Sequence, residues 1–361
     1  MKASSIAKCH LTVGGVSRRF YIFPLMLLLF GLCLGLTCPP QAGAANPGDT
    51  YVFPAQSPVA PDGSSQQSGP TLSGNIALWS EYDSGLRKTR LFFKDLSKGP
   101  GEPGHALISG EYDGATPEIN QAGNRVVWSE MIGAQRHVYY KDVDFSGSFS
   151  GCTGTVDKCA TALSPDNYWQ ENPSISPDGS KVVWENGRGH GSQIRIYDFN
   201  TGIEQDLYGM PGGDQEYPSV DNEWVVWKDN RNFNDFTFPL NQHIYARRIG
   251  SPDAQVSIAD NGGSAYASVG SAKIGRNLNN EPVVVYVKAA TGYKPSFSVR
   301  LHNLADGSDI QLVRSKGRLD GPSINGDKVV WLDCSENLRC DVVLLTGGSQ
   351  LYDCDHTTIG C

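Results

Sequence analysis

The chain has 361 residues, with 30 Lys and Arg against 38 Asp and Glu, and a net charge of −8 at pH 7. Because an acidic chain repels the phosphate backbone, we expect no nucleic-acid partner. A cation, a basic ligand or a basic protein surface fits this charge better.

Residues 1–44 are interpreted as a signal peptide. They carry four basic residues and no acid, then the apolar run 20–36, then small residues at Ala42 and Ala44. This order is typical of secretory signals. The alternative, a retained membrane anchor, is less favoured because Pro24 interrupts a run that is only marginally long enough to span a bilayer. Cleavage after Ala44 would leave 26 Lys and Arg against 38 Asp and Glu, a net charge of −12. We therefore expect an exported protein, periplasmic or extracellular, without a stable membrane span after cleavage.

Residues 45–68 are rich in Pro, Ser and Gly and are interpreted as a linker. Within them, the segment 50–53, Thr-Tyr-Val-Phe, has β-strand composition. The sequence leaves open whether this segment pairs with a distant part of the chain.

Residues 69–361 contain a repeated pattern that is clearest in 173–184, PSISPDGSKVVW. In each copy, a short apolar segment and a turn lead to an apolar strand that ends in an aromatic residue. Six copies are present, with their aromatics at Trp79, Trp128, Trp184, Trp227, Tyr286 and Trp331. A repeat of this length that is built from short strands indicates a propeller or a related array.

Each copy continues with a polar hairpin, a second β-rich run such as QIRIYDF (193–199), a turn, and a short last strand. Every unit therefore predicts four antiparallel strands, which is the composition of a propeller blade. The Val-Val-Trp strands are apolar on both faces, as expected for strands buried between two blades. We predict an all-β fold, a six-bladed β-propeller of four-stranded antiparallel blades over 69–361. The segment 50–53 would close the ring if it joined the last blade.

The segment 173–184, followed by IYDFNTG (196–202), resembles the repeat of the TolB-type β-propellers. The segment 225–231, VVWKDNR, is similar to the form found in related bacterial and archaeal cell-surface propellers. The resemblance covers all six units and implies the fold, but it says little about function. The fifth unit departs from the pattern, because Tyr286 replaces the Trp and Lys288 replaces the following acid.

Six cysteines lie after residue 44 and form three close pairs along the sequence. The pairs are Cys152 with Cys159, Cys334 with Cys340, and Cys354 with Cys361. In an oxidising compartment we expect disulfides, and closeness in sequence favours three local loops among the many possible pairings. A zinc site is not predicted, because the C-x2-C spacing is missing.

No catalytic residue, metal site or cofactor is predicted. Ser174 and Ser176 are interpreted as strand-end and turn residues, because the equivalent positions vary among Ser, Asn and Asp. His137 and His243 share one repeat position on third strands and are interpreted as structural, whereas His190 lies in a hairpin. The segment 229–235 has alternating oxygen side chains, but it lacks the glycine and distal glutamate of a calcium loop.

Two sets of acids recur with the repeat. The inner set, two places before the repeat proline, is Glu171, Glu216 and Asp320. The outer set, two places after the anchor aromatic, is Glu81, Glu130, Asp229 and Asp333. Chain direction places both sets on one face of the ring, with the inner set nearer the mouth of the channel. The outer set could accept hydrogen bonds from hairpin N–H groups, or both sets could form an acidic funnel for a cation or a basic ligand.

We therefore predict an exported, non-enzymatic propeller that binds a protein or ligand in the cell envelope or the extracellular space through its acidic face. The alternative is a propeller hydrolase or lyase that acts on a polysaccharide and holds the sugar with Tyr168 and Trp169. Fold alone does not decide between these functions, since propellers support both.

Overall fold

The computed structural model divides the chain into two units, 1–45 and 46–361. All of the described residues lie in the second unit. They are 50–53, 66–83, 88–95, 97, 104–109, 114–145, 152–153, 156–187, 191–207, 213–231, 242–251, 255–259, 267–290, 296–326, 328–336 and 339–346. Within these ranges the strands form six four-stranded sheets and one two-stranded sheet.

The first three blades follow one another along the chain, each running from its innermost to its outermost strand. Blade 1 consists of β2 (Gln66–Ser73), β3 (Ile76–Asp83), β4 (Lys88–Asp95) and β5 (His105–Ala106). Blade 2 consists of β7 (Gly114–Ile119), β8 (Arg125–Ile132), β9 (Gln135–Asp142) and β11 (Thr161–Ala162). Blade 3 consists of β12 (Trp169–Ile175), β13 (Lys181–Gly187), β14 (Ser192–Asp198) and β15 (Ile203–Asp206). Between β9 and β11, blade 2 also carries the short helix α1 (Val156–Cys159) and β10 (Cys152–Thr153), which pairs with β6 (Ile108–Ser109).

The last three blades repeat the arrangement. Blade 4 consists of β16 (Gln215–Val220), β17 (Trp224–Asp229), β18 (His243–Arg248) and β19 (Val256–Ala259). Blade 5 consists of β20 (Ala267–Arg276), β21 (Pro282–Ala290), β22 (Ser296–Asn303) and β23 (Asp309–Ser315). Blade 6 consists of β24 (Arg318–Asn325), β25 (Lys328–Glu336), β26 (Arg339–Thr346) and, as its outermost strand, β1 (Thr50–Phe53). The six-bladed propeller predicted from the repeats is confirmed.

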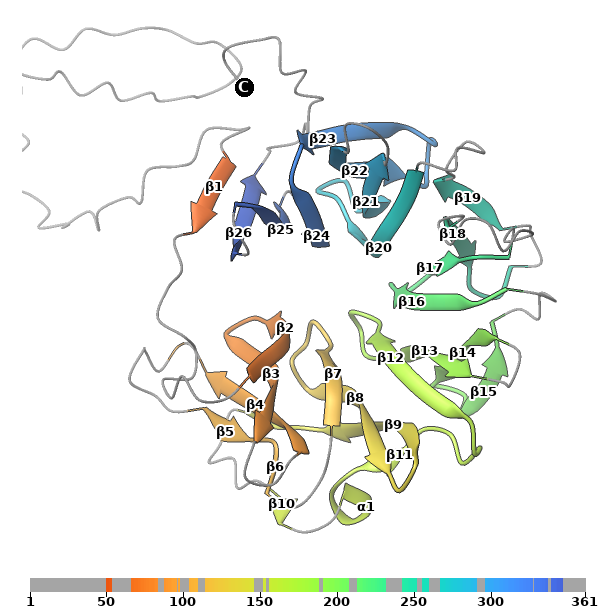
Figure 1. The fold of residues 1–361 in the computed structure, drawn as a ribbon. Helices are drawn as coiled ribbons and strands as arrows, with labels where there is room; N and C mark the ends of the chain where they lie inside the picture. Colours follow the sequence, from red (N-terminus) through yellow and green to blue (C-terminus); the bar gives the residue numbers. More distant parts are fainter. Residues whose placement is uncertain are drawn as a thin grey trace, which may run out of the picture. The chain divides into compact units, whose positions relative to one another are not determined.

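Blade 6 combines strands from both ends of the described chain. Thr50 lies opposite Leu345 and Phe53 lies opposite Val342, so β1 runs antiparallel to β26. This pairing answers the question that the sequence left open about the segment 50–53. Figure 1 shows the innermost strands of all six blades arranged around a centre, with the remaining strands of each sheet farther out.

Five hydrophobic clusters lie between successive blades, and each contains the anchor aromatic of one blade. Trp128 and Trp184 are fully buried, and Trp227 and Tyr286 are 1% exposed. The valines that precede Trp128 and Trp184 are also fully buried, although neighbouring side chains of a strand point to opposite faces. The Val-Val-Trp strands are therefore covered on both faces, as the sequence predicted.

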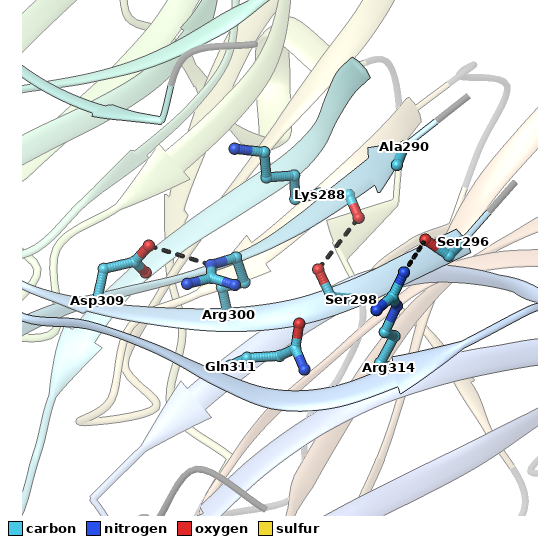
Figure 2. Close-up of a pocket in the computed structure, with 8 residues that line it drawn as sticks. All are labelled: Lys288, Ala290, Ser296, Ser298, Arg300, Asp309, Gln311 and Arg314. Atoms are coloured by element: carbon cyan, nitrogen blue, oxygen red, sulfur yellow. Dashed lines mark hydrogen bonds and ion pairs between the residues drawn. The ribbon is translucent and has the colours of Figure 1, made fainter. Parts of the chain in front are cut away.

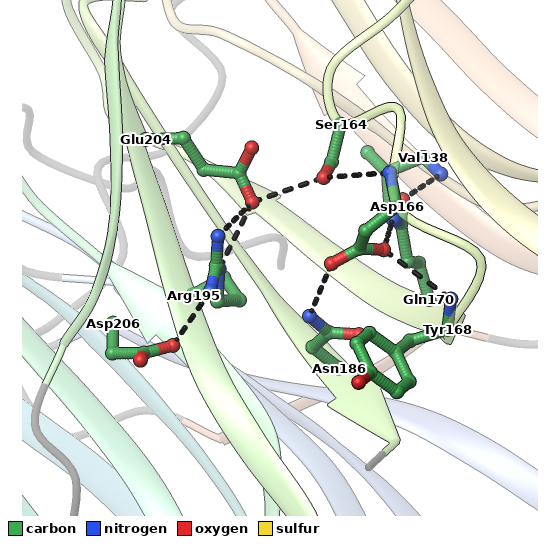
Figure 3. Close-up of polar contacts among 9 residues, drawn as sticks. All are labelled: Val138, Ser164, Asp166, Tyr168, Gln170, Asn186, Arg195, Glu204 and Asp206. Carbon is green, nitrogen blue, oxygen red and sulfur yellow. Dashed lines mark hydrogen bonds and ion pairs between the residues drawn. The ribbon is translucent and has the colours of Figure 1, made fainter.

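A buried glutamine, Gln170, connects blades 2 and 3 by a hydrogen bond (Figure 3). The Gln170 side chain is fully buried and its oxygen accepts the Val138 backbone N–H of blade 2 at 2.9 Å. Its amide nitrogen donates to Asp166 at 2.6 Å, and Asp166 also accepts from Asn186 at 2.9 Å. Because a buried amide is costly unless its groups are paired, this network fixes how blade 3 sits against blade 2.

The turn that follows the inner strand of blade 3 is held by its own side chains. Ser176 is fully buried, donates to Asp178 at 2.6 Å, and accepts the Lys181 backbone N–H at 2.9 Å. Gly179 has a φ of +74°, and a Cβ there would lie 2.7 Å from the Asn120 amide nitrogen of blade 2. The Pro-Asp-Gly sequence therefore supplies both the turn geometry and the space for the neighbouring blade.

Candidate binding site at the channel mouth

A β-bulge interrupts every innermost strand near its start. In five blades the residue before the repeat proline has a positive φ, between 49° and 57°. Gly69 and Gly321 tolerate this conformation, and Asn172 adopts it more readily than most residues do, but Thr116 and Tyr217 do not adopt it readily. Non-glycine residues in this conformation are uncommon outside functional or tightly constrained positions. The three non-glycine positions belong to the consecutive blades 2, 3 and 4.

The inner acid Glu171 lies directly opposite Glu185 in the register of β12 and β13. Cβ atoms of such cross-strand pairs are about 5 Å apart, so two carboxyl groups share one small region. Glu171 is half-buried, whereas Glu185 is 6% exposed. Two like charges at this separation repel each other, which disfavours ionisation of both groups together.

Glu185 connects blades 3 and 4. Its carboxylate accepts a hydrogen bond from the Asn172 amide at 2.8 Å and another from the backbone N–H of Tyr217. Burial raises the pKa of the Glu185 carboxyl to about 7, and the charges of Glu171 and Glu216 add to the rise, while the two hydrogen bonds oppose it. Glu185 therefore changes its charge near neutral pH.

The second inner acid, Glu216, forms an ion pair with Lys228 at 2.8 Å across β16 and β17. The same ammonium group lies 4.7 Å from the centre of the Tyr217 ring. Tyr217 is 48% exposed, so its ring is a large aromatic surface beside a cluster of acids. An exposed tyrosine flanked by carboxylates is a suitable environment for a cation.

The third inner acid, Asp320 of blade 6, pairs with Arg318 at 2.7 Å. Burial raises the pKa of the Tyr217 hydroxyl, and the charges of four acids raise it further. These acids are Glu185, Glu216, Glu171 and Asp320. All three predicted inner acids therefore lie within electrostatic reach of one tyrosine, although they come from three different blades.

The three inner acids lie within electrostatic reach of Tyr217, but the mouth of the channel carries less negative charge than the sequence predicted. Lys228 and Arg318 each neutralise one inner acid. Within the described ranges, Glu171 and Glu185 form no ion pair. The residual negative charge is therefore concentrated at the boundary of blades 3 and 4, beside Tyr217.

Deeper in the channel, an ion pair connects blades on opposite sides of the ring. Glu118 of β7 pairs with Lys273 of β20, which is 155 residues away. Glu118 also accepts the backbone N–H of Ile175 at 3.2 Å. At the same strand position, the Ser174 hydroxyl accepts from Val220 at 3.4 Å, and that of Ser219 accepts from Ile274 at 3.3 Å. Hydrogen bonds from a backbone N–H of one inner strand to a side chain of the preceding inner strand therefore link successive blades. Ser174 takes part in one of these bonds and has a structural role.

The outer acids bind the anchor tryptophans. The indole N–H donates to the acid two places later in three blades: Trp79 to Glu81 at 3.1 Å, Trp128 to Glu130 at 3.3 Å and Trp227 to Asp229 at 3.0 Å. Glu130 and Asp229 are each 1% exposed. The expectation that hairpin N–H groups are the partners holds in part, since Asp229 also accepts the Arg231 backbone N–H at 2.8 Å. The sequence-based prediction considered only backbone N–H groups of the hairpin as donors. Side chains two residues apart lie on the same face of a strand, which places the acid beside the indole N–H.

The sixth blade lacks this contact. The Trp331 indole N–H is buried without a hydrogen-bond partner, and Asp333 lies opposite Asp341 in the register of β25 and β26. The four outer acids therefore do not all share the same hydrogen-bond partner.

Cys159 and Cys334 are each disulfide-bonded. The three local pairings remain a prediction, and Cys354 and Cys361 lie outside the described residues, as does His190. Among the described residues no three His, Cys, Asp or Glu side chains gather as they would around a metal ion. The possible calcium loop begins at Asp229, whose carboxylate binds Trp227 and Arg231, and residues 232–235 are not described.

No protein-family model matches the chain, and a search of curated proteins finds no relative. Solved structures do match. A puromycin-hydrolysing peptidase from Mycobacterium tuberculosis is 12% identical with a TM-score of 0.54, and the match covers 84% of this chain and 55% of that one. A prolyl endopeptidase is 14% identical with a TM-score of 0.51, over 80% of this chain and 42% of that one.

A putative TolB from Agrobacterium tumefaciens is 16% identical with a TM-score of 0.48, over 69% of this chain and 81% of that one. At these identities the likenesses concern the fold, and the chain spans about half the length or less of the two peptidases. These comparisons therefore do not assign a peptidase activity to this chain. The chain is a six-bladed β-propeller, the fold that its TolB-like repeats predicted.

Proposed function

We propose that this protein is an exported, non-enzymatic propeller that binds a basic group of a protein partner at the boundary of blades 3 and 4. The observation that carries the proposal is the convergence of Glu171, Glu185, Glu216 and Asp320 on the exposed Tyr217. A lysine or arginine of a partner could pair with Glu171 and stack on the tyrosine ring, two contacts that favour a cation over a neutral group.

The intramolecular contact of Lys228 supports this choice of ligand. Its ammonium group already occupies the combination of a carboxylate, Glu216, and the Tyr217 ring. A partner cation would find a similar combination in Glu171 and Tyr217. Export and an envelope or extracellular location belong to the proposal and rest on the features of residues 1–44. No helix in the described part of the chain is long and apolar enough to cross a membrane.

Reversing the charge of Glu171 is expected to weaken binding of a basic peptide about tenfold, the loss that one charge-assisted contact produces. The measurement titrates tetralysine into the wild type and into Glu171→Lys by calorimetry at low ionic strength. The matched control is Glu223→Lys, which makes the same charge change in the exposed turn at the other end of β16 and β17. Equal affinity of wild type and Glu171→Lys, or equal losses in both variants, would refute the proposal.

One specific observation supports a second function, the hydrolysis of a polysaccharide. Many glycoside hydrolases use a pair of carboxyl groups, one of which has a raised pKa, and Glu171 lies opposite Glu185, whose pKa is raised to about 7. Tyr168 and Trp169 are 44% and 39% exposed and lie just before Glu171 on the chain. Against this function, the Glu185 carboxylate is buried and already accepts two hydrogen bonds from the protein. Turnover in a polysaccharide screen with added divalent metal, lost in Glu171→Gln, would establish the enzyme instead.

A further inference from the structure

Blade 5 contains a basic pocket in an otherwise acidic protein. The pocket has a volume of about 290 Å³, and Figure 2 shows the eight residues that line it. They are Lys288, Ala290, Ser296, Ser298, Arg300, Asp309, Gln311 and Arg314. Three of these side chains are cationic and one is a carboxylate, so the lining has a net charge of +2, whereas the whole chain has −8.

The pocket arises from the departure of the fifth unit from the repeat. In blades 1, 2 and 4 the anchor tryptophan stacks on an aromatic of the next strand and donates its indole N–H to the acid two places later. In blade 5 the anchor is Tyr286, and Arg300 lies opposite it instead of an aromatic ring. The Tyr286 hydroxyl donates to Asp309 of β23 at 3.0 Å, so its hydrogen bond points outward along the blade.

Lys288 takes the place of the acid that the other units use. Its cross-strand neighbour is Ser298, which in turn lies opposite Arg314. No carboxylate among the described residues pairs with Lys288. Ala290, Ser296 and Ser298 line the pocket with small side chains, and the Lys288 side chain extends away from Ala290 and Ser296, towards the side of Arg300 and Asp309 (Figure 2). The only lining carboxylate, Asp309, is engaged by Arg300 at 3.0 Å and by Tyr286.

In blade 3, an arginine at the position equivalent to Arg300 does not by itself create a basic pocket. Arg195 occupies the position of Arg300, opposite Trp184, and binds both Glu204 and Asp206 (Figure 3). Two carboxylates there balance one cation. In the blade 5 pocket Arg300 is paired with Asp309, whereas Lys288 forms no ion pair among the described residues, so a negative ligand would pair with Lys288.

We propose that this pocket binds an oxyanion group: a carboxylate, a sulfate or a phosphate. Lys288 supplies a charge-assisted donor and Gln311 a neutral one, whereas the Ser298 hydroxyl already donates to the Lys288 carbonyl oxygen at 3.3 Å and Arg314 donates to Ser296 at 3.3 Å. The volume suits a small ion or one acidic group of a small molecule. The site lies on β21, β22 and β23 and does not depend on the acidic channel mouth, so either proposal can fail without the other.

The test restores the acid of the repeat by the substitution Lys288→Glu. Sodium acetate, sulfate and phosphate are titrated separately into the full-length protein at constant ionic strength, and amide shifts of blade 5 are followed by NMR. Saturable shifts are expected for at least one of the three anions in the wild type. In Lys288→Glu the affinity should fall at least about tenfold, because a cation is replaced by a like charge.

The control is Lys316→Glu, which makes the same change at an exposed lysine of the turn after β23 that does not line the pocket. This variant should bind as the wild type does. Which anion binds distinguishes a planar carboxylate from a tetrahedral ligand. The absence of saturable shifts with all three anions, or equal losses in both variants, would overturn the proposal. Lys288→Gln serves as the milder variant if Lys288→Glu fails to fold.

Discussion

Replacing Glu185 with glutamine is expected to raise the free energy of unfolding at pH 8 by about 3 kcal/mol and to leave it nearly unchanged at pH 4.5. Burial raises the pKa of this carboxyl from 4.5 to about 7. The folded protein therefore holds the proton more tightly than the unfolded chain does. The stability that this proton contributes is complete below pH 4.5 and is lost as the pH rises towards 7. Glutamine removes the titration and keeps an oxygen that can accept from Asn172 and Tyr217.

Urea unfolding of the wild type and of Glu185→Gln at pH 4.5, 6 and 8 measures this difference. The wild-type curve should lose stability between pH 4.5 and 7 more steeply than the curve of the variant. Glu223→Gln, a change in an exposed turn, should keep the wild-type pH dependence. A variant that is less stable than the wild type at pH 8 would show that the ionised carboxylate stabilises the boundary of blades 3 and 4, contrary to the burial argument.

The same titration bears on the proposed function. Above pH 7 Glu185 adds a negative charge beside Glu171, and below pH 7 it is neutral. Binding of tetralysine should therefore strengthen between pH 6 and 8 in the wild type and should change less in Glu185→Gln. The acidic mouth would then respond to pH through a residue that the partner does not need to touch.

The fold could be predicted from the sequence because the repeat fixes both the strands and their burial. An apolar strand that ends in a large aromatic residue is stable when both of its faces are covered, and six such strands predict six blades. The partner of β1 could not be predicted, since four residues of β-strand composition would fit any free sheet edge. Pairing with β26 depends on where the ring closes, which local composition does not encode.

The candidate site could be predicted only in part. The positions of Glu171, Glu216 and Asp320 follow from the repeat, because equivalent residues of all blades lie at one end of the channel. The role of Glu185 depends on its register with Glu171 and on the backbone of the next blade, which the repeat does not specify. The pairing of Glu118 with Lys273 likewise needs the closed ring, which brings residues 155 positions apart into contact.

The fifth unit departs from the repeat in its sequence, but the consequence of this departure cannot be predicted from single positions. Lys288 stands in place of an acid, and the effect of this change depends on the cross-strand neighbours Ser298 and Arg314. A substitution in a repeat changes function only when the neighbouring strands leave space and charge for it. Comparing whole cross-strand rows between blades, rather than single positions, would have identified the basic pocket.

Replacing Asp229 with alanine is expected to lower the free energy of unfolding by about 3–5 kcal/mol, the cost of breaking a buried ion pair from one side. Asp229 is 1% exposed, and its carboxylate binds the Arg231 guanidinium and accepts the Trp227 indole N–H at 3.0 Å. Alanine would leave a largely buried cation and a buried N–H without a partner. Glu216→Ala, which removes a half-exposed acid from the same blade, should cost less than about 1 kcal/mol.

Urea unfolding of both variants separates the two acid sets. The double variant Asp229→Ala/Arg231→Ala should lose at least about 1 kcal/mol less than the sum of its single changes, because the unpaired cation is then gone. Folded Asp229→Ala should still bind tetralysine with wild-type affinity, since Asp229 is enclosed by Trp227 and Arg231. A small loss of stability together with a large loss of affinity would place Asp229 in the binding surface. The acidic mouth would then extend outward along blade 4 to the second acid set.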